Sequence, residues 1–169
     1  MANEKLLVIV NDRLSEIVKK GEITERYYNP GNLFDEVHIL MLNDDVVNPD
    51  VVQKTVGLAK LILHNLPVPS FKRTLGWRPW LLNKWVMEAA EFVRNISPDL
   101  IRCYGIGLNA YLSARIQEEL QIPYAVSIHT QLDERKRIDV DGRIFKHRLA
   151  DLLGGNIYEI GMNKANIIL

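Results

Sequence analysis

Residues 97–130 read SPDLIRCYGIGLNAYLSARIQEELQIPYAVSIHT, and this stretch decides the fold of the chain. It contains an apolar run from Asp99 to Tyr104, a glycine turn, a helical pattern and a second apolar run from Tyr124 to Ile128. Two apolar strands joined by one helix within about thirty residues are typical of a βαβ unit, whose strands are parallel. The sequence therefore predicts a parallel sheet at the centre of the molecule.

The helical pattern between these two runs has one apolar stripe. Its leucines and isoleucine recur every four residues and have one tyrosine beside them, as in Leu108, Tyr111, Leu112, Ile116 and Leu120. Such a stripe packs on a sheet, while the polar residues of the remaining arc face water. Proline stops the helix at Ile122-Pro123. The second strand then leads to His129 and Thr130 at its carboxyl end, where open parallel sheets bind ligands.

The rest of the chain alternates apolar runs with helical patterns. Apolar runs predict strands over residues 6–10, 37–42 and 58–66, although the last also fits a helix. Helical spacing predicts helices after the first strand and over residues 49–57, 80–96, 143–153 and 157–165. Asn11 or Asp12 is predicted to cap the first of them, and Gly21 to end it. The predicted fold class is α/β, a Rossmann-like doubly wound and mainly parallel sheet flanked by helices.

Composition limits the classes of function. A chain of 169 residues that is 47% hydrophobic can close one core, so we expect a single domain over residues 1–169. Its 21 basic and 21 acidic residues give no net charge that would favour a nucleic-acid partner. Cys103 is the only cysteine, which excludes an internal disulfide and favours a reducing compartment. Without a long apolar segment we expect a cytoplasmic protein, with peripheral membrane contact left open.

The end of the sequence favours a domain excised from a larger protein. Residues 166–169 read NIIL and begin an apolar run that resembles a strand. Strands commonly run for about five or six residues and are followed by a polar turn. We therefore expect the natural protein to continue beyond Leu169.

Residues 105–110 match the G-x-G-x-x-A pattern of dinucleotide-binding turns, since they follow a strand and open a helix. In the nicotinamide-binding fold an acidic residue at the end of the following strand holds the ribose. Here that strand leads into His129, and the first acid is Asp133. This departure favours a purely structural role for Gly105 and Gly107, although their backbone amides could bind a phosphate or a hydroxyl. A dinucleotide-binding domain stays an alternative.

His129 is the candidate for chemistry. A neutral imidazole beyond a buried strand can exchange hydrogen bonds with a sugar hydroxyl, and a packing role is equally compatible with its position. The other histidines show no ligand spacing, so we predict no metal site. Trp77 and Trp80, near a proline-rich loop at residues 67–79, are candidates for stacking on a sugar or a partner, although core packing is the simpler interpretation.

The order of these elements resembles the amino-terminal half of retaining glycosyltransferases of the GT-B fold, family 4 type. The similarity rests on a buried first strand at residues 6–10, Pro98-Asp99 before an apolar strand, Ile122-Pro123-Tyr124 after a helix, and Ser127-Ile128-His129. Residues 164–169 likewise resemble the family's strand that leads toward the second domain. The resemblance spans most of the chain, and its order is more specific than its short motifs.

The resemblance implies a site. The histidine that matches His129 lies beside the donor sugar in the family, so it implies that His129 is catalytic, with Thr130, Gly105 and Gly107 close to the substrate. The family's first loop usually carries adjacent glycines, where this chain has Asn11-Asp12. The residues Lys20, Gly21 and Glu22 are substrate-binding candidates by position only.

The resemblance also implies an activity. A family member moves a sugar from a nucleotide-sugar donor to an acceptor with retention of configuration and needs no cofactor. Most of the donor site lies in the family's carboxyl-terminal domain, so this chain would be the acceptor-side domain and inactive alone. The implied partners are the donor and a glycan, lipid-linked or small-molecule acceptor. A noncatalytic interaction domain is a further alternative.

Overall fold

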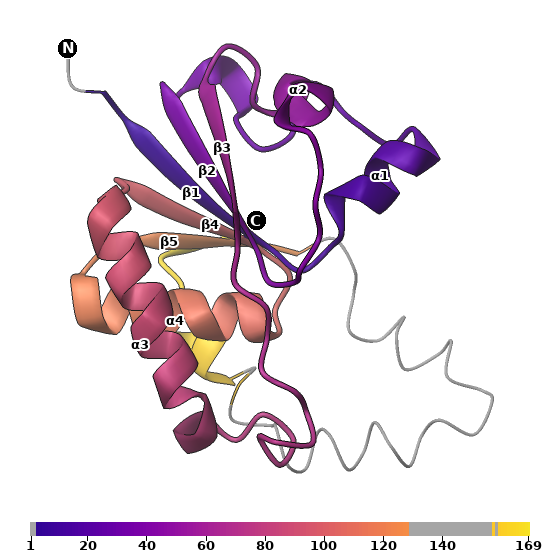
Figure 1. The fold of residues 1–169 in the computed structure, drawn as a ribbon. Helices are drawn as coiled ribbons and strands as arrows, with labels where there is room; N and C mark the ends of the chain where they lie inside the picture. The colour runs from indigo at the N-terminus through magenta and orange to yellow at the C-terminus, as the bar shows by residue number, and fades with distance from the viewer. Residues whose placement is uncertain (1–2, 129–156, 158) are drawn as a thin grey trace.

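The computed structural model describes residues 3–128, 157 and 159–169. Its centre is a six-stranded sheet in the order β3-β2-β1-β4-β5-β6, in which every neighbouring pair is parallel (Figure 1). The strands are β1 (Lys5–Val10), β2 (Glu36–Met41), β3 (Lys60–Asn65), β4 (Leu100–Tyr104), β5 (Tyr124–Ser127) and β6 (Ile167–Ile168). This sheet and its flanking helices confirm the predicted Rossmann-like α/β fold.

Helices cover both faces of the sheet. They are α1 (Leu14–Lys20), α2 (Pro49–Val52), α3 (Pro79–Ile96) and α4 (Leu108–Leu120), with 3₁₀ turns η1 (Pro30–Asn32) and η2 (Gln53–Val56) and further helical residues at 157 and 159–163. Right-handed crossovers place the helices of connections that run in opposite directions along a sheet on opposite faces. The helices α1 and α2 therefore pack on one face, and α3 and α4 on the other (Figure 1).

The central strand β1 is buried on both faces because it lies between these two layers. Leu7 and Ile9 face α3 and α4, while Leu6, Val8 and Val10 face α1 and α2. A strand in this position must be apolar at every residue rather than at alternate ones. The position of β1 between the two helix layers therefore explains why its run of apolar residues in the sequence is uninterrupted.

The helix α4 is buried over more of its surface than one stripe. Besides the predicted apolar stripe, the small or polar residues Asn109, Ala110, Ser113 and Ala114 are buried. The sheet, α3 and the helical segment at 159–163 all pack against α4, so most of its circumference is covered. The small residues of α4 therefore let its neighbours approach closely.

The cap of α1 differs from the prediction. The N-cap residue is Arg13, which makes no side-chain cap, so the prediction of Asn11 or Asp12 is wrong. Asp45, in the loop after β2, instead accepts hydrogen bonds from the backbone N of Ser15 at 2.9 Å and from its Oγ at 2.6 Å. A distant carboxylate thus satisfies the first turn of this helix. Gly21 ends α1 with φ 71°, as predicted.

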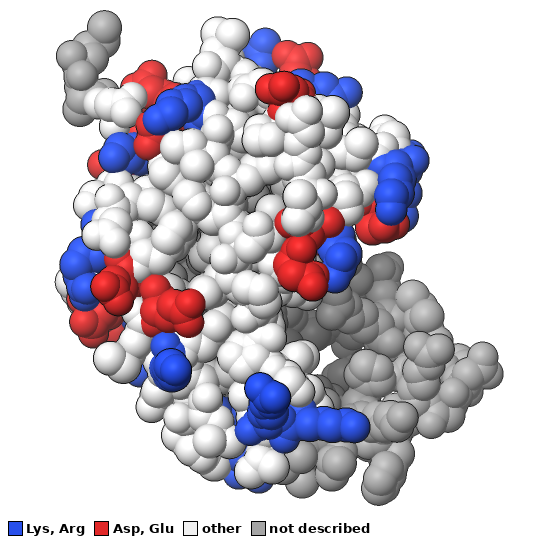
Figure 2. Space-filling view, viewed as in Figure 1, with Lys and Arg blue, Asp and Glu red and all other residues white. Residues whose placement is uncertain are grey.

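Two other helix predictions have different outcomes. The helix predicted for residues 49–57 is divided into α2 and η2, and Gly57, with φ 66°, follows it. The helix predicted for residues 143–153 lies outside the described residues. Over the described residues, acidic and basic side chains lie side by side on the upper and middle parts of the face seen in Figure 2, whereas its lower end carries basic side chains alone.

A histidine pair joins the edge strand β3 to β2. His38 Nδ1 lies 2.8 Å from His64 Nε2, and His38 Nε2 lies 2.7 Å from Glu36 Oε1. Phe92 from α3 packs edge-on against the half-buried His64, and Lys60 pairs with Glu36 from the solvent side. Burial, and secondarily His38, lowers the pKa of His64 from 6.5 to about 4. The folded state therefore holds His64 neutral.

Stability is expected to fall in mild acid because of His64. Its folded pKa is lower than its unfolded pKa, so the contribution is complete above pH 6.5 and is lost as the pH falls toward about 4. Solvent screening at this half-buried site reduces the effect to about 1–2 kcal/mol. Urea unfolding at a series of pH values should show this loss, and His64→Gln should flatten it. An unchanged slope in His64→Gln would contradict the assignment.

Candidate functional site

A cavity of about 610 Å³ lies at the carboxyl ends of β1 and β4. These two strands are neighbours, yet the chain leaves β1 toward β2 and leaves β4 toward β5 on the other side. Such a reversal of direction opens a crevice beyond the strand ends, and open α/β sheets bind their ligands there. The walls come from residues 10–12 after β1, the segment 22–28, and residues 104–109 after β4.

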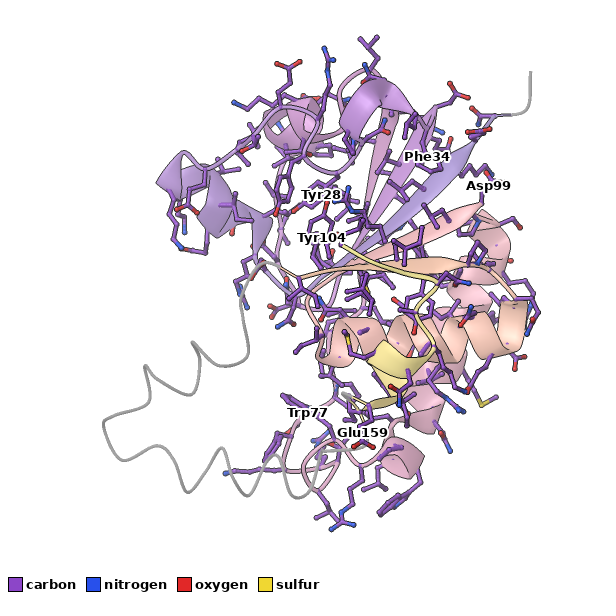
Figure 3. All side chains as sticks on the ribbon, turned by 180° about the vertical axis from the view of Figure 1, so that it is seen from behind. Tyr28, Phe34, Trp77, Asp99, Tyr104 and Glu159 are labelled. Atoms are coloured by element: carbon purple, nitrogen blue, oxygen red, sulfur yellow. The ribbon has the colours of Figure 1, made fainter. Side chains whose placement is uncertain are left out.

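Three tyrosines form the aromatic wall of the cavity. Tyr104 at the end of β4 lies with its ring centroid 5.3 Å from that of Tyr27 and 5.2 Å from that of Tyr28. Its hydroxyl donates to the carbonyl oxygen of Tyr27 at 3.1 Å. Figure 3 shows Tyr28 and Tyr104 close together, although they come from opposite sides of the central strand. Tyr28 and Tyr104 are buried, so they hold in place the exposed ring of Tyr27, which presents an apolar face with a polar edge.

The electrostatic state of these phenols follows from their burial. Burial is the largest cause that raises the pKa of Tyr28 and of Tyr104. Arg102, whose guanidinium carbon lies 4.8 Å from the centroid of the Tyr104 ring, opposes this shift without cancelling it. Both hydroxyls therefore stay protonated at neutral pH, and they supply hydrogen-bonding capacity without charge.

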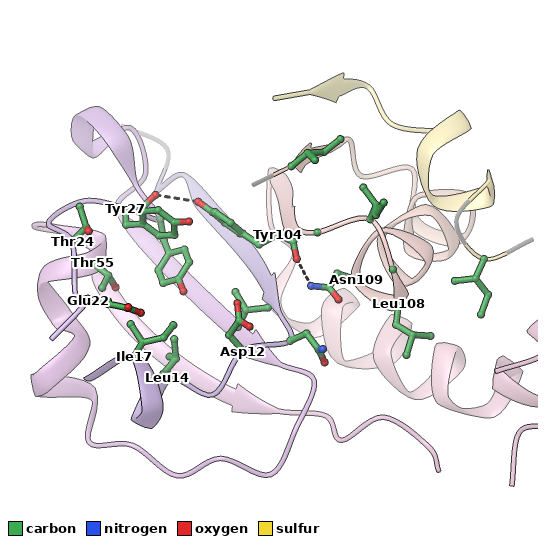
Figure 4. A pocket seen from close by; sticks show the side chains of 18 of the residues that line it. Asp12, Leu14, Ile17, Glu22, Thr24, Tyr27, Thr55, Tyr104, Leu108 and Asn109 are labelled. Atoms are coloured by element: carbon green, nitrogen blue, oxygen red, sulfur yellow. Dashed lines mark hydrogen bonds between the residues drawn. The ribbon is translucent and has the colours of Figure 1, made fainter. Parts of the chain in front are cut away.

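The polar lining contains carboxylates and neutral groups. Asp12 and Glu22 bring the two acidic side chains, and Asn11, Thr24, Thr55 and Asn109 bring amides and hydroxyls (Figure 4). Among the described residues that line the cavity there is no lysine, arginine or histidine. Carboxylates accept hydrogen bonds from hydroxyl groups and repel phosphates. The described lining therefore suits a neutral, hydroxyl-rich ligand with an apolar face.

The glycine turn after β4 is held in place by hydrogen bonds. Gly105 has φ 98°, which strongly favours glycine. Its backbone N donates to the carbonyl oxygen of Ser127 at 2.9 Å, which ties the turn to the end of β5. The buried side chain of Asn109 donates to the carbonyl oxygen of Tyr104. These bonds hold the turn at the edge of the cavity and give Gly105 and Asn109 a structural role.

The structure brings some of the predicted site residues together. Glu22, Gly105 and Gly107 all line the cavity. Lys20 and Gly21 are not among its lining residues, because they form the carboxyl-terminal end of α1, where Gly21 N–H donates to the carbonyl oxygen of Val18. A substrate-binding role for any of the five stays a prediction.

His129 and Thr130 lie outside the described residues. Ile128, which directly precedes His129 in the chain, lines the cavity and donates its backbone N–H to the carbonyl oxygen of Leu169 at 2.9 Å. The end of β5 is therefore at the cavity. The catalytic role of His129 stays a prediction. No group of three or more metal-ligating side chains occurs within the described part of the chain.

Most of the residues that line the cavity could not be recognised from the sequence. The local pattern assigns Asp12 to a helix cap and Tyr104 to a buried strand. The pair Tyr27-Tyr28 precedes the turn residues Asn-Pro-Gly, and two adjacent aromatic residues before a turn are the available signal. Nothing in the local sequence indicates that these segments meet, because β4 lies far from them in the chain.

Comparisons with known proteins show a likeness in fold. No family model and no curated protein matches the sequence. One similar solved structure is a protein assigned as a UDP-N-acetylglucosamine 2-epimerase from Listeria monocytogenes, with 15% identity, a TM-score of 0.50, and coverage of 99% of this chain and 45% of that chain. Another is UDP-GlcNAc 2-epimerase from Neisseria meningitidis bound to UDP-GlcNAc, with 13% identity, a TM-score of 0.44, and coverage of 98% and 46%.

The low sequence identity and the partial coverage limit the conclusion to the fold. At 15% identity the match to the Listeria protein supports a GT-B-type Rossmann domain as the fold of this chain. The chain spans less than half of the length of the solved structures it resembles. The likeness therefore concerns the fold, and not the activity or the substrate.

Proposed function

We propose that this chain is the acceptor-side domain of a two-domain enzyme of GT-B architecture that acts on nucleotide sugars. The observation that carries this proposal is the lining of the cavity at the ends of β1 and β4, where tyrosine rings and carboxylates occur without a described cation. A sugar ring has an apolar face that packs on an aromatic ring and hydroxyls that donate to carboxylates. The cavity therefore takes the sugar or acceptor part of a substrate.

The nucleotide part requires a second domain. Asp12 and Glu22 disfavour phosphate groups in the cavity, so the phosphates of a nucleotide need basic residues or helix N-termini from another source. A GT-B enzyme supplies these from its other domain across the cleft. The short span of this chain relative to the similar solved structures fits that division.

The reaction we propose is sugar transfer with retention of configuration. The order of sequence elements that resembles family 4 glycosyltransferases supports it, and His129 follows Ile128 at the cavity. In this scheme the imidazole of His129 donates to or accepts from a sugar hydroxyl, and Asp12 or Glu22 accepts a hydrogen bond from the acceptor. The donor phosphate oxygens and these hydrogen bonds stabilise an oxocarbenium-like transition state.

Two other functions, one reaction and one binding role, would use the same cavity. Epimerisation of a nucleotide sugar is a second candidate, because a protein assigned to that activity has the same fold. It needs no acceptor, so a reaction of the completed enzyme that proceeds without one would favour it. Dinucleotide binding at Gly105 and Gly107 is the other alternative, since this turn also lines the cavity.

Asp12→Asn is expected to weaken sugar binding by about tenfold, since hydrogen bonds to a charged group are worth about 1.5–3 kcal/mol. Calorimetric titration of the 169-residue chain with N-acetylglucosamine, UDP and NAD measures this. The matched control is Asp50→Asn, which alters an exposed carboxylate at the start of α2, away from the cavity. Tighter binding of UDP or NAD than of the sugar, unaffected by Asp12→Asn, would overturn the proposal.

A further inference from the structure

In the segment between β3 and the middle of α3, all charged side chains are positive. From Leu66 to Met87 the sequence contains four basic residues and no acidic one, whereas the whole chain has 21 of each. The basic residues are Lys72, Arg73, Arg78 and Lys84. In Figure 2, lysine and arginine side chains gather without acidic neighbours at the lower end of this face, over the loop that precedes α3. This is a local positive surface on a chain with no net charge.

Large apolar side chains are exposed on the same segment. Leu75 is 61% exposed and Trp80 58% exposed, and Phe71 is also exposed. Together with Lys72, Gly76 and Arg78 they line a shallow groove, which we call the basic aromatic patch. The guanidinium of Arg78 lies 5.0 Å from the centroid of the Trp80 ring. Exposed aromatic and basic side chains therefore alternate across one surface.

The backbone of the patch is held in an uncommon conformation. Leu75, Gly76 and Trp77 have φ angles of 47°, 85° and 59°. Positive φ angles are costly at the two residues of this trio that are not glycine, and surrounding contacts must hold them there.

Hydrogen bonds inside the loop supply these contacts. The buried Thr74 donates from Oγ1 to the carbonyl oxygen of Ser70 at 3.0 Å and accepts from the backbone N of Trp77 at 3.1 Å. Trp77 Nε1 donates to the carbonyl oxygen of Pro69 at 3.1 Å. The loop thus turns Trp77 toward the protein while Leu75 stays in solvent.

We propose that the basic aromatic patch docks the chain on an anionic membrane surface. Tryptophan and phenylalanine insert at the level of lipid headgroups, and nearby lysine and arginine are attracted to anionic lipids. The described residues contain no helix that is long and apolar enough to cross a bilayer. The patch offers both kinds of side chain that such docking uses, the exposed Phe71 and Trp80 and the basic Lys72 and Arg78.

The patch adjoins the candidate site. Phe71 and Gly76 belong both to the patch and to the lining of the cavity, and the neighbouring Trp77 also lines the cavity. A docked chain would hold the cavity beside the lipid surface, where a lipid-linked acceptor is presented. Membrane docking rests on the side chains of the patch alone, so it does not depend on the proposed reaction.

Vesicle sedimentation of the 169-residue chain tests the docking. Binding to phosphatidylcholine vesicles that contain phosphatidylglycerol is expected to exceed binding to pure phosphatidylcholine vesicles by at least about tenfold. Added salt should reduce it, because ions screen exposed charges. Absence of binding, or equal binding to both vesicle types, would overturn the proposal.

A matched pair of double variants assigns the binding to the patch. Lys72→Gln with Leu75→Ser is expected to lower binding to the anionic vesicles by about tenfold or more. Lys54→Gln with Leu58→Ser is the control, because Leu58 is 91% exposed and Lys54 is a lysine outside the patch. The control should bind as the unchanged chain does.

Further measurements separate the other outcomes. Arg73→Gln alters one exposed charge beside the patch without touching the loop backbone, and it should lower binding several-fold even if the double variant fails to fold. Equal loss in the patch and control variants would contradict the assignment. A self-association seen by light scattering that the patch variant abolishes, without vesicle binding, would show a protein interface instead.

Discussion

Tyr104→Ala is expected to lower the free energy of unfolding by about 3–5 kcal/mol, the range for removing a large buried aromatic side chain. The buried ring of Tyr104 packs against Tyr27, Tyr28 and the guanidinium of Arg102. Its loss leaves a space in the aromatic wall of the cavity, beside Tyr27 and Tyr28. Urea unfolding measures the stability, and titration with N-acetylglucosamine should show that sugar binding is lost as well.

Tyr104→Phe is the matched control, because it keeps the ring. It removes the hydrogen bond from the Tyr104 hydroxyl to the carbonyl oxygen of Tyr27, at a cost of about 0.5–1.5 kcal/mol. Sugar binding through the aromatic face should survive. If the phenylalanine and alanine variants were equally destabilised, the packing of the ring would not be the source of the effect.

Gly161→Ala is expected to lower the free energy of unfolding by about 2–3 kcal/mol through overpacking. Gly161 lies in the helical segment 159–163, whose backbone rests on α4. An added Cβ would lie 2.7 Å from the carbonyl carbon of Ala110 and 2.8 Å from the backbone N of Tyr111. Backbone atoms cannot rotate away, so the segment has to shift. Thermal or urea unfolding measures the loss.

The sign of the change in stability for Gly161→Ala distinguishes a packed helix from an exposed one. In an exposed helix the same change would raise stability by about 1 kcal/mol, because alanine is the better helix former. Gly21→Ala is a control that meets no atom within 4 Å and adds only the cost of its positive φ. A stabilised Gly161→Ala variant would contradict the close packing. Tyr124→Phe, which removes a 2.7 Å hydrogen bond to the Gly161 carbonyl oxygen, tests the same junction from β5.

The packing of Gly161 also explains the small residue at the end of the glycine motif. Ala110 completes the G-x-G-x-x-A pattern, and its Cβ lies 2.7 Å from the point that a Cβ on Gly161 would occupy. Two positions of the motif are therefore accounted for, Gly105 by its positive φ and Ala110 by close helix packing. Both features are structural, which agrees with the missing ribose ligand.

Local patterns were sufficient for the architecture. The uninterrupted apolar run of β1 indicated a strand covered on both faces, and the spacing of α3 and α4 indicated two helices, although α4 is buried over more than the predicted stripe. These patterns are read within one element, so they can be predicted without the tertiary structure. The cap of α1 could not, because Asp45 reaches it from a loop thirty residues away in the chain.

The sequence alone determined that the chain alternates strands and helices in a parallel, doubly wound sheet. Hydrophobic periodicity and runs of β-branched residues indicate which residues of each element are buried, and these patterns are local. Only the tertiary structure decided what faces the crevice. Asp12, Tyr27 and Tyr104 come from three segments and meet because β1 and β4 are neighbours that the chain leaves in opposite directions. Contact between segments far apart in the chain depends on strand order, and no local pattern encodes that order.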